Sequence, residues 1–373
     1  MYKLAFNILL IVSFLGTSTL RAIDLSSFKR EYSKEIKKDF KFFGTELVSL
    51  NNQFGKISVE TWSKDRVKLA IEIKVKAENE SQAQKIFKRI SIQFNNASDL
   101  IEAITVVHKE EKSWWQWSSE NTNFEINYTV FMPASASLIV KNKYGDVYLG
   151  ELTGVVDLDL KYGNYQCDGF TDDCTFSFKY SEGRINYAKQ ISGDIKYGSL
   201  TLIDADELII ESKYSNIDIT TIGNIKAETG YDNYIINKVG ECILNGKYNN
   251  VSINNADVLF VNSKYSKFDI GSVLSYLSFD VSYSEVNINH TDPSFSDIRL
   301  QGRYSDFDLT LGRNTSFQLD AKSEYAGITY PRDLTISHER EQSSVQEVKG
   351  WVGNQSAPMI KARLKYGSLK LRK

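Results

Sequence analysis

The segment Lys213-Tyr214-Ser215-Asn216-Ile217-Asp218-Ile219 decides the fold, because its arrangement returns along most of the chain. It returns, for example, at residues 196–202 (Lys-Tyr-Gly-Ser-Leu-Thr-Leu) and at residues 247–253 (Lys-Tyr-Asn-Asn-Val-Ser-Ile). Each copy is a Lys-Tyr pair, a two-residue turn, and then an apolar-polar-apolar strand. Gly, Ser, Asp and Asn fill the turn positions, and these are turn-forming residues. Self-similarity at a fixed period indicates a repeat protein.

Twelve tyrosines share this place in the repeat: Tyr144, Tyr162, Tyr180, Tyr197, Tyr214, Tyr231, Tyr248, Tyr265, Tyr283, Tyr304, Tyr325 and Tyr366. Most of the intervals between them are 17 or 18 residues, two are 21 and the last is 41. Apolar and polar residues alternate on both sides of the turn, as in a strand with one buried face. Identical units superpose when each coil stacks about 4.8 Å from the last. We therefore predict an all-β fold, a single-chain parallel β-solenoid (β-helix) of about 12 coils of 17–21 residues, with right-handed coiling.

Strand alternation predicts where the tyrosine side chains point. Each Tyr lies two residues after an apolar position such as Leu160, Phe178 or Ile195, so the two are expected to share the inward face. Stacked coils would then build a structural ladder of rings against the core. The alternative is an exposed aromatic strip that grips sugar rings.

The Lys or Arg that precedes nine of the twelve tyrosines is expected to face outward. Acidic side chains two residues earlier would relieve the repulsion within this row: Asp159, Asp194, Glu211 and Glu228. A solvated charge ladder is one interpretation, and a strip for an anionic ligand is the other. Asn216, Asn233 and Asn250 share one turn position, where their amides can bond from coil to coil.

Composition bounds the function. The chain has 373 residues, a formal net charge of −2, 42% hydrophobic residues, and only three His and three Cys. This charge does not fit a nucleic-acid-binding protein of the usual basic kind. The three cysteines, Cys167, Cys174 and Cys242, contain no CxxC motif, and we expect them to be buried apolar residues. Little material is left for a metal centre, so we predict no metal site and no cofactor.

The two ends differ from the repeat. Residues 1–22 start with a basic residue, continue as a short apolar run and end in small residues, which predicts a cleaved signal peptide and no transmembrane segment in the mature chain. Residues 23–135 predict an N-terminal segment with a first coil around Phe54 and a β-rich cap containing one short helix. The helix is expected to begin with a Ser81–Gln84 capping box. Residues 136–373 predict the solenoid, with an irregular loop near 337–356 before a last coil at residues 360–371.

A family resemblance follows from these stretches. The segments 54–62 (Phe-Gly-Lys-Ile-Ser-Val-Glu-Thr-Trp) and 131–138 (Phe-Met-Pro-Ala-Ser-Ala-Ser-Leu), followed by serial Tyr-Gly/Ser turns, resemble the putative adhesin family of β-strand-repeat proteins. They are also similar to the auto-transporter adhesin head group named for its Gly-Ile-Asn motif. In this chain, Tyr replaces the Gly that the family usually has before the turn. The resemblance implies a β-solenoid at the cell envelope.

Catalytic motifs are missing from the sequence. Parallel β-helices also carry polysaccharide lyases and hydrolases, whose carboxyl groups must lie within about 10 Å of one another. Asp218 and Asp269 share a row but lie three coils apart, and Asp306 and Asp308 occupy ordinary repeat positions. A polysaccharide-active enzyme is therefore the alternative and not the prediction.

The best candidates for partner contact interrupt the repeat. Trp114, Trp115 and Trp117 form a cluster that either closes the solenoid mouth or contacts a partner. We predict an exported, non-catalytic adhesin or cell-envelope scaffold, located in the periplasm, on the outer surface or secreted. Its expected partner is a cell-surface protein or glycan, and no nucleic acid.

Overall fold

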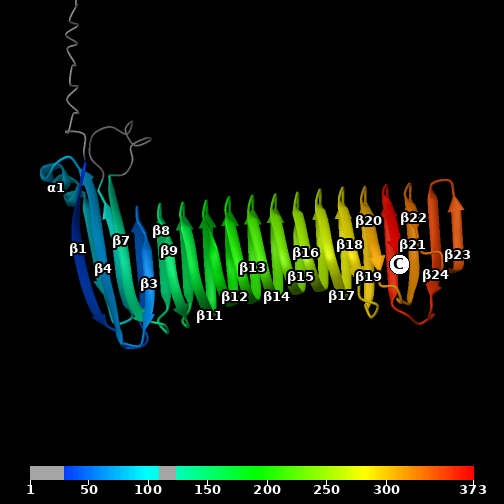
Figure 1. Ribbon diagram of the computed structural model, residues 1–373, viewed down its shortest axis with the longest axis horizontal. Coiled ribbons are helices and arrows are strands. Elements are labelled where there is room, and N and C mark those ends of the chain that lie inside the picture. The colour runs from blue at the N-terminus through cyan, green and yellow to red at the C-terminus, as the bar shows by residue number, and fades with distance from the viewer. Residues whose placement is uncertain (1–28, 109–122) are drawn as a thin grey trace, which may run out of the picture.

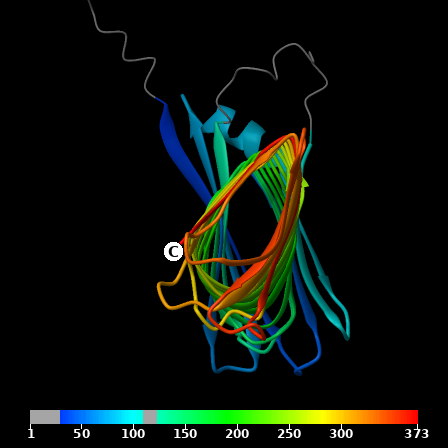
Figure 2. The same cartoon turned by 90° about the vertical axis from the view of Figure 1, so that its right-hand side faces the viewer.

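The protein is a straight parallel β-solenoid, seen in a computed structural model that describes residues 29–108 and 123–373 (Figure 1). The predicted signal peptide and the Trp114–Trp117 cluster lie outside the described residues. Viewed along the axis, the stacked coils form a flattened closed loop around the core (Figure 2). The predicted all-β parallel solenoid is confirmed. Within the described residues, no helix is long and apolar enough to cross a membrane.

The central coils are each one long strand of 15 or 16 residues that wraps around the core. They are β11 (Asn164–Lys179), β12 (Glu182–Lys196), β13 (Ser199–Lys213), β14 (Asn216–Gly230), β15 (Asn233–Lys247), β16 (Asn250–Lys264) and β17 (Lys267–Ser282). Each pairs in parallel with the next, so that equivalent residues align, as in the row Leu208, Ile225, Cys242 and Leu259. All three cysteines are free and buried, as predicted.

The first and last coils are divided into shorter strands. These are β2 (Leu47–Gln53), β3 (Ile57–Trp62), β8 (Leu138–Lys143), β9 (Val147–Leu152), β10 (Val156–Lys161), β18 (Glu285–Thr291), β19 (Asp297–Arg303), β20 (Asp306–Leu311), β21 (Phe317–Glu324), β22 (Gly327–Thr329), β25 (Met359–Lys365) and β26 (Ser368–Arg372). Their inward residues continue the same core.

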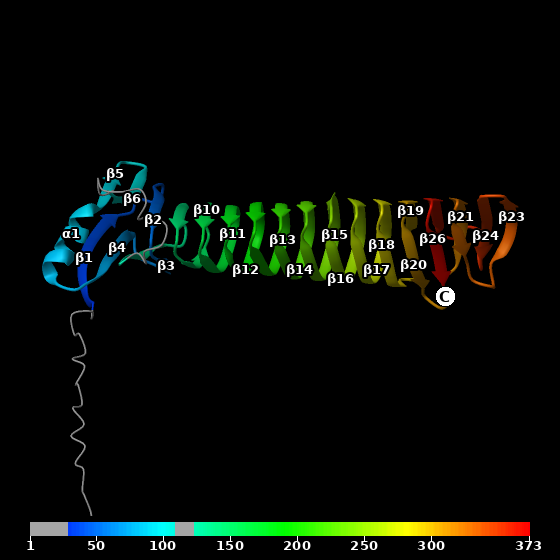
Figure 3. The same cartoon turned by 90° about the horizontal axis from the view of Figure 1, so that it is seen from above.

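Antiparallel strands close the N-terminal end (Figure 3). The cap consists of β1 (Arg30–Lys41), β4 (Arg66–Ala77), α1 (Glu80–Arg89), β5 (Ile90–Asn96), β6 (Leu100–Val107) and β7 (Phe124–Pro133). Strand β6 pairs in parallel with β2, and β7 pairs in parallel with β3. On their other edges, β6 pairs antiparallel with β5, and β7 pairs antiparallel with β4. Since antiparallel strands break the parallel stacking, they end the solenoid there.

The helix in this cap begins earlier than the predicted capping box. Asn79 is the N-cap, and its side chain accepts a hydrogen bond of 3.0 Å from the backbone N–H of Gln82. The Gln82 side chain accepts in turn from the backbone N–H of Glu78. The reciprocal capping bonds therefore form two residues upstream of the predicted Ser81–Gln84 pair. The predicted apolar face is present, with Ala83 and Phe87 buried.

At the C-terminal end, the order of coils departs from the order of the sequence. Residues 337–356, predicted as an irregular loop, contain most of a β-hairpin, β23 (Thr335–Gln342) and β24 (Val345–Val352). Strand β24 pairs antiparallel with β21 and closes that edge. The chain then returns, and β25 and β26 insert between β19–β20 and β21–β22 (Figure 1). The final coil in sequence is therefore not the final coil in space.

Candidate functional site

The twelve repeat tyrosines lie on the outside of the solenoid, so the predicted inward orientation is wrong. Their exposed fractions run from 37% for Tyr366 to 60% for Tyr325. All twelve have left-handed backbone, with φ between 51° and 61°, and Phe54 in the first coil has φ 62°. A left-handed residue turns the chain sharply, so strand alternation does not continue through it. The ring therefore points away from the core, although it lies two residues after an inward position.

The rings form one continuous exposed ladder, which we call the tyrosine ridge (the twelve repeat tyrosines). Neighbouring Tyr rings stack with centroids 4.6–5.1 Å apart and planes 3–19° from parallel. Phe54 extends the stack at the N-terminal end, 5.3 Å from Tyr144. At the other end, Tyr366 stands between Tyr304 and Tyr325, because β25 and β26 are inserted there.

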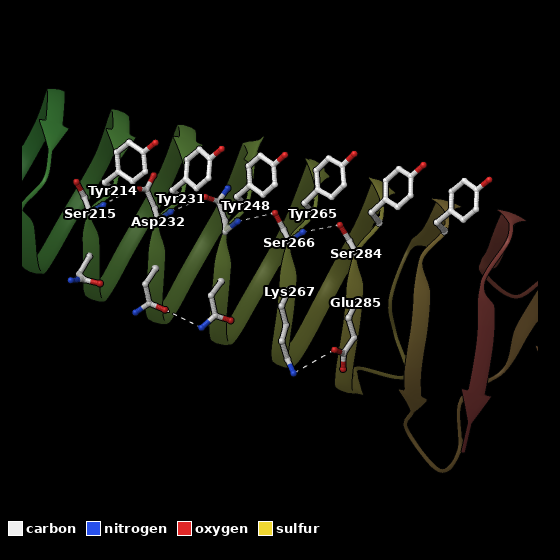
Figure 4. A pocket seen from close by; sticks show the side chains of 16 residues that line it. Tyr214, Ser215, Tyr231, Asp232, Tyr248, Tyr265, Ser266, Lys267, Ser284 and Glu285 are labelled. Atoms are coloured by element: carbon white, nitrogen blue, oxygen red, sulfur yellow. Dashed lines mark hydrogen bonds and ion pairs between the residues drawn. The ribbon is translucent and has the colours of Figure 1, made fainter.

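Stacking leaves only part of each ring free for contact. The faces of a ring inside the ridge lie against its neighbours, while the hydroxyl groups point outward, as they do for Tyr214, Tyr231, Tyr248 and Tyr265 (Figure 4). A ligand thus meets a row of ring edges and phenol hydroxyls. The ridge is not built for sugar rings to stack on aromatic faces, which is how the alternative interpretation of an exposed strip would work.

At these turns, left-handed backbone gives tyrosine a conformational free-energy cost that glycine would not have. Left-handed geometry costs an L-residue about 1–2 kcal/mol, and glycine avoids most of this cost. Ring stacking contributes about 0.5–1.5 kcal/mol per pair beyond burial. The two effects are of similar size, so folding energy alone does not account for a Tyr at every turn. Repeated strain of this kind points to a role in function.

A buried polar network holds the turns beneath the ridge. Asp232, 3% exposed, accepts hydrogen bonds from the backbone N–H groups of Ser215 (2.7 Å) and Gly230 (2.9 Å). It also accepts from the hydroxyls of Ser212 (2.8 Å) and Thr229 (2.6 Å). Four donors therefore satisfy this buried carboxylate without a cation.

The same connection runs from coil to coil. The backbone N–H of each turn residue donates to the side chain at the same position in the next coil: Asp232 to Asn249 (3.0 Å), Asn249 to Ser266 (3.0 Å), Ser266 to Ser284 (3.1 Å) and Ser284 to Ser305 (3.1 Å). These bonds fix successive turns relative to one another. They place the rings of the ridge in register.

An open groove of about 1100 Å³ follows the ridge from Tyr214 to Tyr304. The rings form one wall, and the turn residues Ser215, Asp232, Ser266 and Ser284 form the floor (Figure 4). The opposite wall is polar: Asn216, Asn233, Asn250, Lys267 and Glu285. Within it, Asn250 donates to Asn233 at 3.1 Å, one step of the predicted amide ladder, and Lys267 lies 3.5 Å from Glu285. The hydrogen bond from Asn287 and the nearby Lys267 lower the pKa of Glu285.

Lysines lie beside several rings of the ridge. The ammonium groups of Lys143, Lys213 and Lys365 lie 4.7, 5.4 and 5.7 Å from the centroids of the adjacent Tyr rings. The predicted relief by acids is seen at Lys196, whose ammonium lies 3.7 Å from Asp194. The ridge thus has a basic border, the nine Lys or Arg residues that directly precede a ridge tyrosine, while Gly230, Ser282 and Glu324 precede the other three.

The structure does not assemble the carboxylates considered for catalysis. Asp218 and Asp269 share a row, but Ile235 and Ser252 separate them. Asp306 accepts a hydrogen bond from Ser368 at 2.6 Å, and Asp308 pairs with Arg372. Burial raises the pKa of the Cys242 thiol to about 12, which makes it a poor nucleophile. In the described part of the chain, no three His, Cys, Asp or Glu side chains are arranged to hold a metal ion.

Comparisons with known proteins found similarity to solved structures only. No family model matches the chain, and no curated protein does. A putative cell adhesion protein from Clostridium sporogenes is 9% identical, covers 91% of this chain and 99% of its own, and has a TM-score of 0.21. A putative adhesin from Parabacteroides distasonis is 11% identical (74% and 97% covered, TM-score 0.37), and one from Bacteroides fragilis is 16% identical (72% and 94%, TM-score 0.29). These names agree with the family that the sequence resembles.

Proposed function

We propose that this protein is an exported, non-catalytic binding scaffold of the cell envelope, an adhesin in the broad sense, and that the tyrosine ridge is its contact surface. The observation that carries the proposal is the ridge itself. Each of its twelve tyrosines occupies a left-handed backbone position, and the hydroxyl groups point outward (Figure 4). Export is supported by the leader-like residues 1–22.

Three further features support a binding role. Neighbouring turns are fixed by the buried polar network, so the ridge is rigid before contact, and pre-organisation favours affinity. The groove beside the ridge extends over six coils, which suits a long partner better than a small molecule. Several solved structures similar to this chain are named as a putative cell adhesion protein or putative adhesins.

The test is a binding assay on the chain from residue 23 onward. Tyr214, Tyr231 and Tyr248 are changed together to Asn, because Asn tolerates left-handed backbone and removes the ring. The control changes three exposed apolar residues outside the ridge to Asn, namely Ile209, Ile235 and Phe260, which are 44%, 49% and 38% exposed. Both variants and the parent are applied to intact cells and to arrays of glycans and matrix proteins.

The ridge variant should lose at least tenfold in binding, while the control variant binds like the parent. Equal binding by all three proteins would refute the ridge as the contact surface. Protease treatment of intact cells tests location separately, since a surface adhesin must be cleaved from outside.

A further inference from the structure

We infer that the partner of the tyrosine ridge is a second copy of this chain, docked side by side and pointing in the same direction. The inference rests on the proposed function and names the partner of its contact surface. Four observations carry it: the area of the ridge, its period, the groove beside it and the charges that border it.

The first observation is area. A tyrosine side chain offers about 150–250 Å², and twelve rings at 37–60% exposure present roughly 1,000 Å² in one strip. A stable interface buries about 800 Å² per partner. The exposed ring edges and hydroxyls of the ridge therefore offer enough area for a stable dimer.

The second observation is period. The solenoid is straight (Figure 1), and the stacked rings of the ridge repeat every 4.6–5.1 Å. A partner that contacts it along its length must also be straight and must repeat at the strand spacing. A second copy of the solenoid satisfies both requirements without further assumptions.

The third observation is shape. The groove lies beside the ridge, between the rings and the wall that contains Asn216, Asn250 and Glu285. A two-fold axis parallel to the ridge places the ridge of each copy in the groove of the other, as an isologous interface requires. A two-fold axis perpendicular to the ridge would instead place ridge on ridge and leave both grooves empty.

The fourth observation is charge, and it selects the same axis. In three coils, a basic residue precedes the Tyr and an acidic residue follows it by two positions: Lys143 with Asp146, Lys179 with Glu182 and Arg303 with Asp306. With the axis parallel to the ridge, the basic border of one copy faces the acidic positions of the other. With the perpendicular axis, the basic borders face each other and repel.

The first test is the mass in solution of the chain from residue 23 onward, measured by analytical ultracentrifugation across the micromolar range. The parent should be a dimer. The Tyr214, Tyr231 and Tyr248 to Asn variant should be a monomer or dissociate at least tenfold more readily. The Ile209, Ile235 and Phe260 to Asn control should remain a dimer.

A charge swap tests the orientation. One variant carries Glu182→Lys and Asp306→Lys, and a second carries Lys179→Glu and Arg303→Glu. Each alone should dimerise poorly, and mixing them in equal amounts should restore a heterodimer with the stability of the parent dimer. Poor pairing in the mixture would overturn the parallel arrangement.

The outcomes separate this inference from the proposed function. If the parent protein is a monomer, the inference that a second copy of this chain is the partner is wrong. If that monomer binds a glycan or matrix protein through the ridge, the proposed function stands with another partner. A dimer that the ridge substitutions leave intact also overturns the inference.

Discussion

Tyr231 and Tyr234 lie three residues apart in the same coil and have opposite environments. Tyr231 is 44% exposed on the ridge, whereas Tyr234 is 0% exposed, with its hydroxyl 2.6 Å from Ser212 Oγ. Burial raises the pKa of Tyr234, so its neutral form is favoured in the folded state. Tyr231 has left-handed backbone at the turn, whereas Tyr234 lies in the extended strand β15 and alternates with the exposed Ile235. The inward positions before the turn have the parity of Tyr231 and those after it have the parity of Tyr234, so the turn resets strand alternation and leaves Tyr231 on the surface.

The largest effect is expected inside the coil. Tyr234→Ala should destabilise the fold by about 3–5 kcal/mol, because it leaves a cavity where a fully buried aromatic ring was. Tyr234→Phe should cost about 1 kcal/mol, since it removes one hydrogen bond and keeps the ring. Urea denaturation measures both. Equal losses for the two variants would show that the ring is not core.

A smaller loss of stability is expected on the ridge, where the smaller residue Gly should be tolerated better than Ala. Tyr231→Ala should cost about 1–3 kcal/mol, because it removes two stacking contacts and keeps the strained backbone. Tyr231→Gly should be more stable than Tyr231→Ala by about 1 kcal/mol, since glycine accepts positive φ. The same denaturation series checks this order. A more stable Ala variant would contradict the left-handed turn.

The smallest effect concerns a pair that is partly exposed. Arg363 in β25 donates to Asp320 in β21 at 2.8 Å and helps hold the inserted strand. Burial alone would raise the pKa of Asp320, but the bond from Arg363 and the nearby Lys349 lower it overall. The stability that this pair contributes is present above the pKa of Asp320 in the unfolded chain. It is lost as the pH falls through the lower pKa that Asp320 has in the folded protein. We expect less than about 1 kcal/mol, because solvent screens the pair.

Stability measured from pH 6 down to pH 2 in the parent and in Asp320→Asn tests this sign. The two curves should converge in acid, where the parent has lost the pair. A constant difference between the curves would show that Asp320 does not titrate in this way.

The sequence was sufficient to predict the solenoid, because the unit of a Tyr and its turn recurs at nearly constant spacing. Strand alternation could not orient the tyrosines, since the rule does not extend through a left-handed residue. One signal was present: the resembling family usually has Gly at this position, and Gly is the usual residue at positive φ. A preference for Gly marks a position that requires positive φ, and strand alternation does not extend through such a position.

The C-terminal arrangement had no comparable signal. Every residue of β23 is exposed, so the strand shows no apolar alternation and resembles a loop in sequence. The repeat unit specifies how coils fit together but not their spatial order, and β25–β26 therefore gave no sign of inserting before β21–β22. The groove was equally hidden, because it depends on the direction of the rings.

We propose that the tyrosine ridge serves contact with a partner and contributes little to folding. The most direct measurement is the free energy of unfolding of the Tyr214, Tyr231 and Tyr248 to Asn variant relative to the parent, both held as monomers at low concentration. We expect the variant to lose less than about 2 kcal/mol, because relief of left-handed strain offsets most of the lost stacking. A loss of about 9 kcal/mol or more, the sum expected for three core aromatic residues, would contradict it.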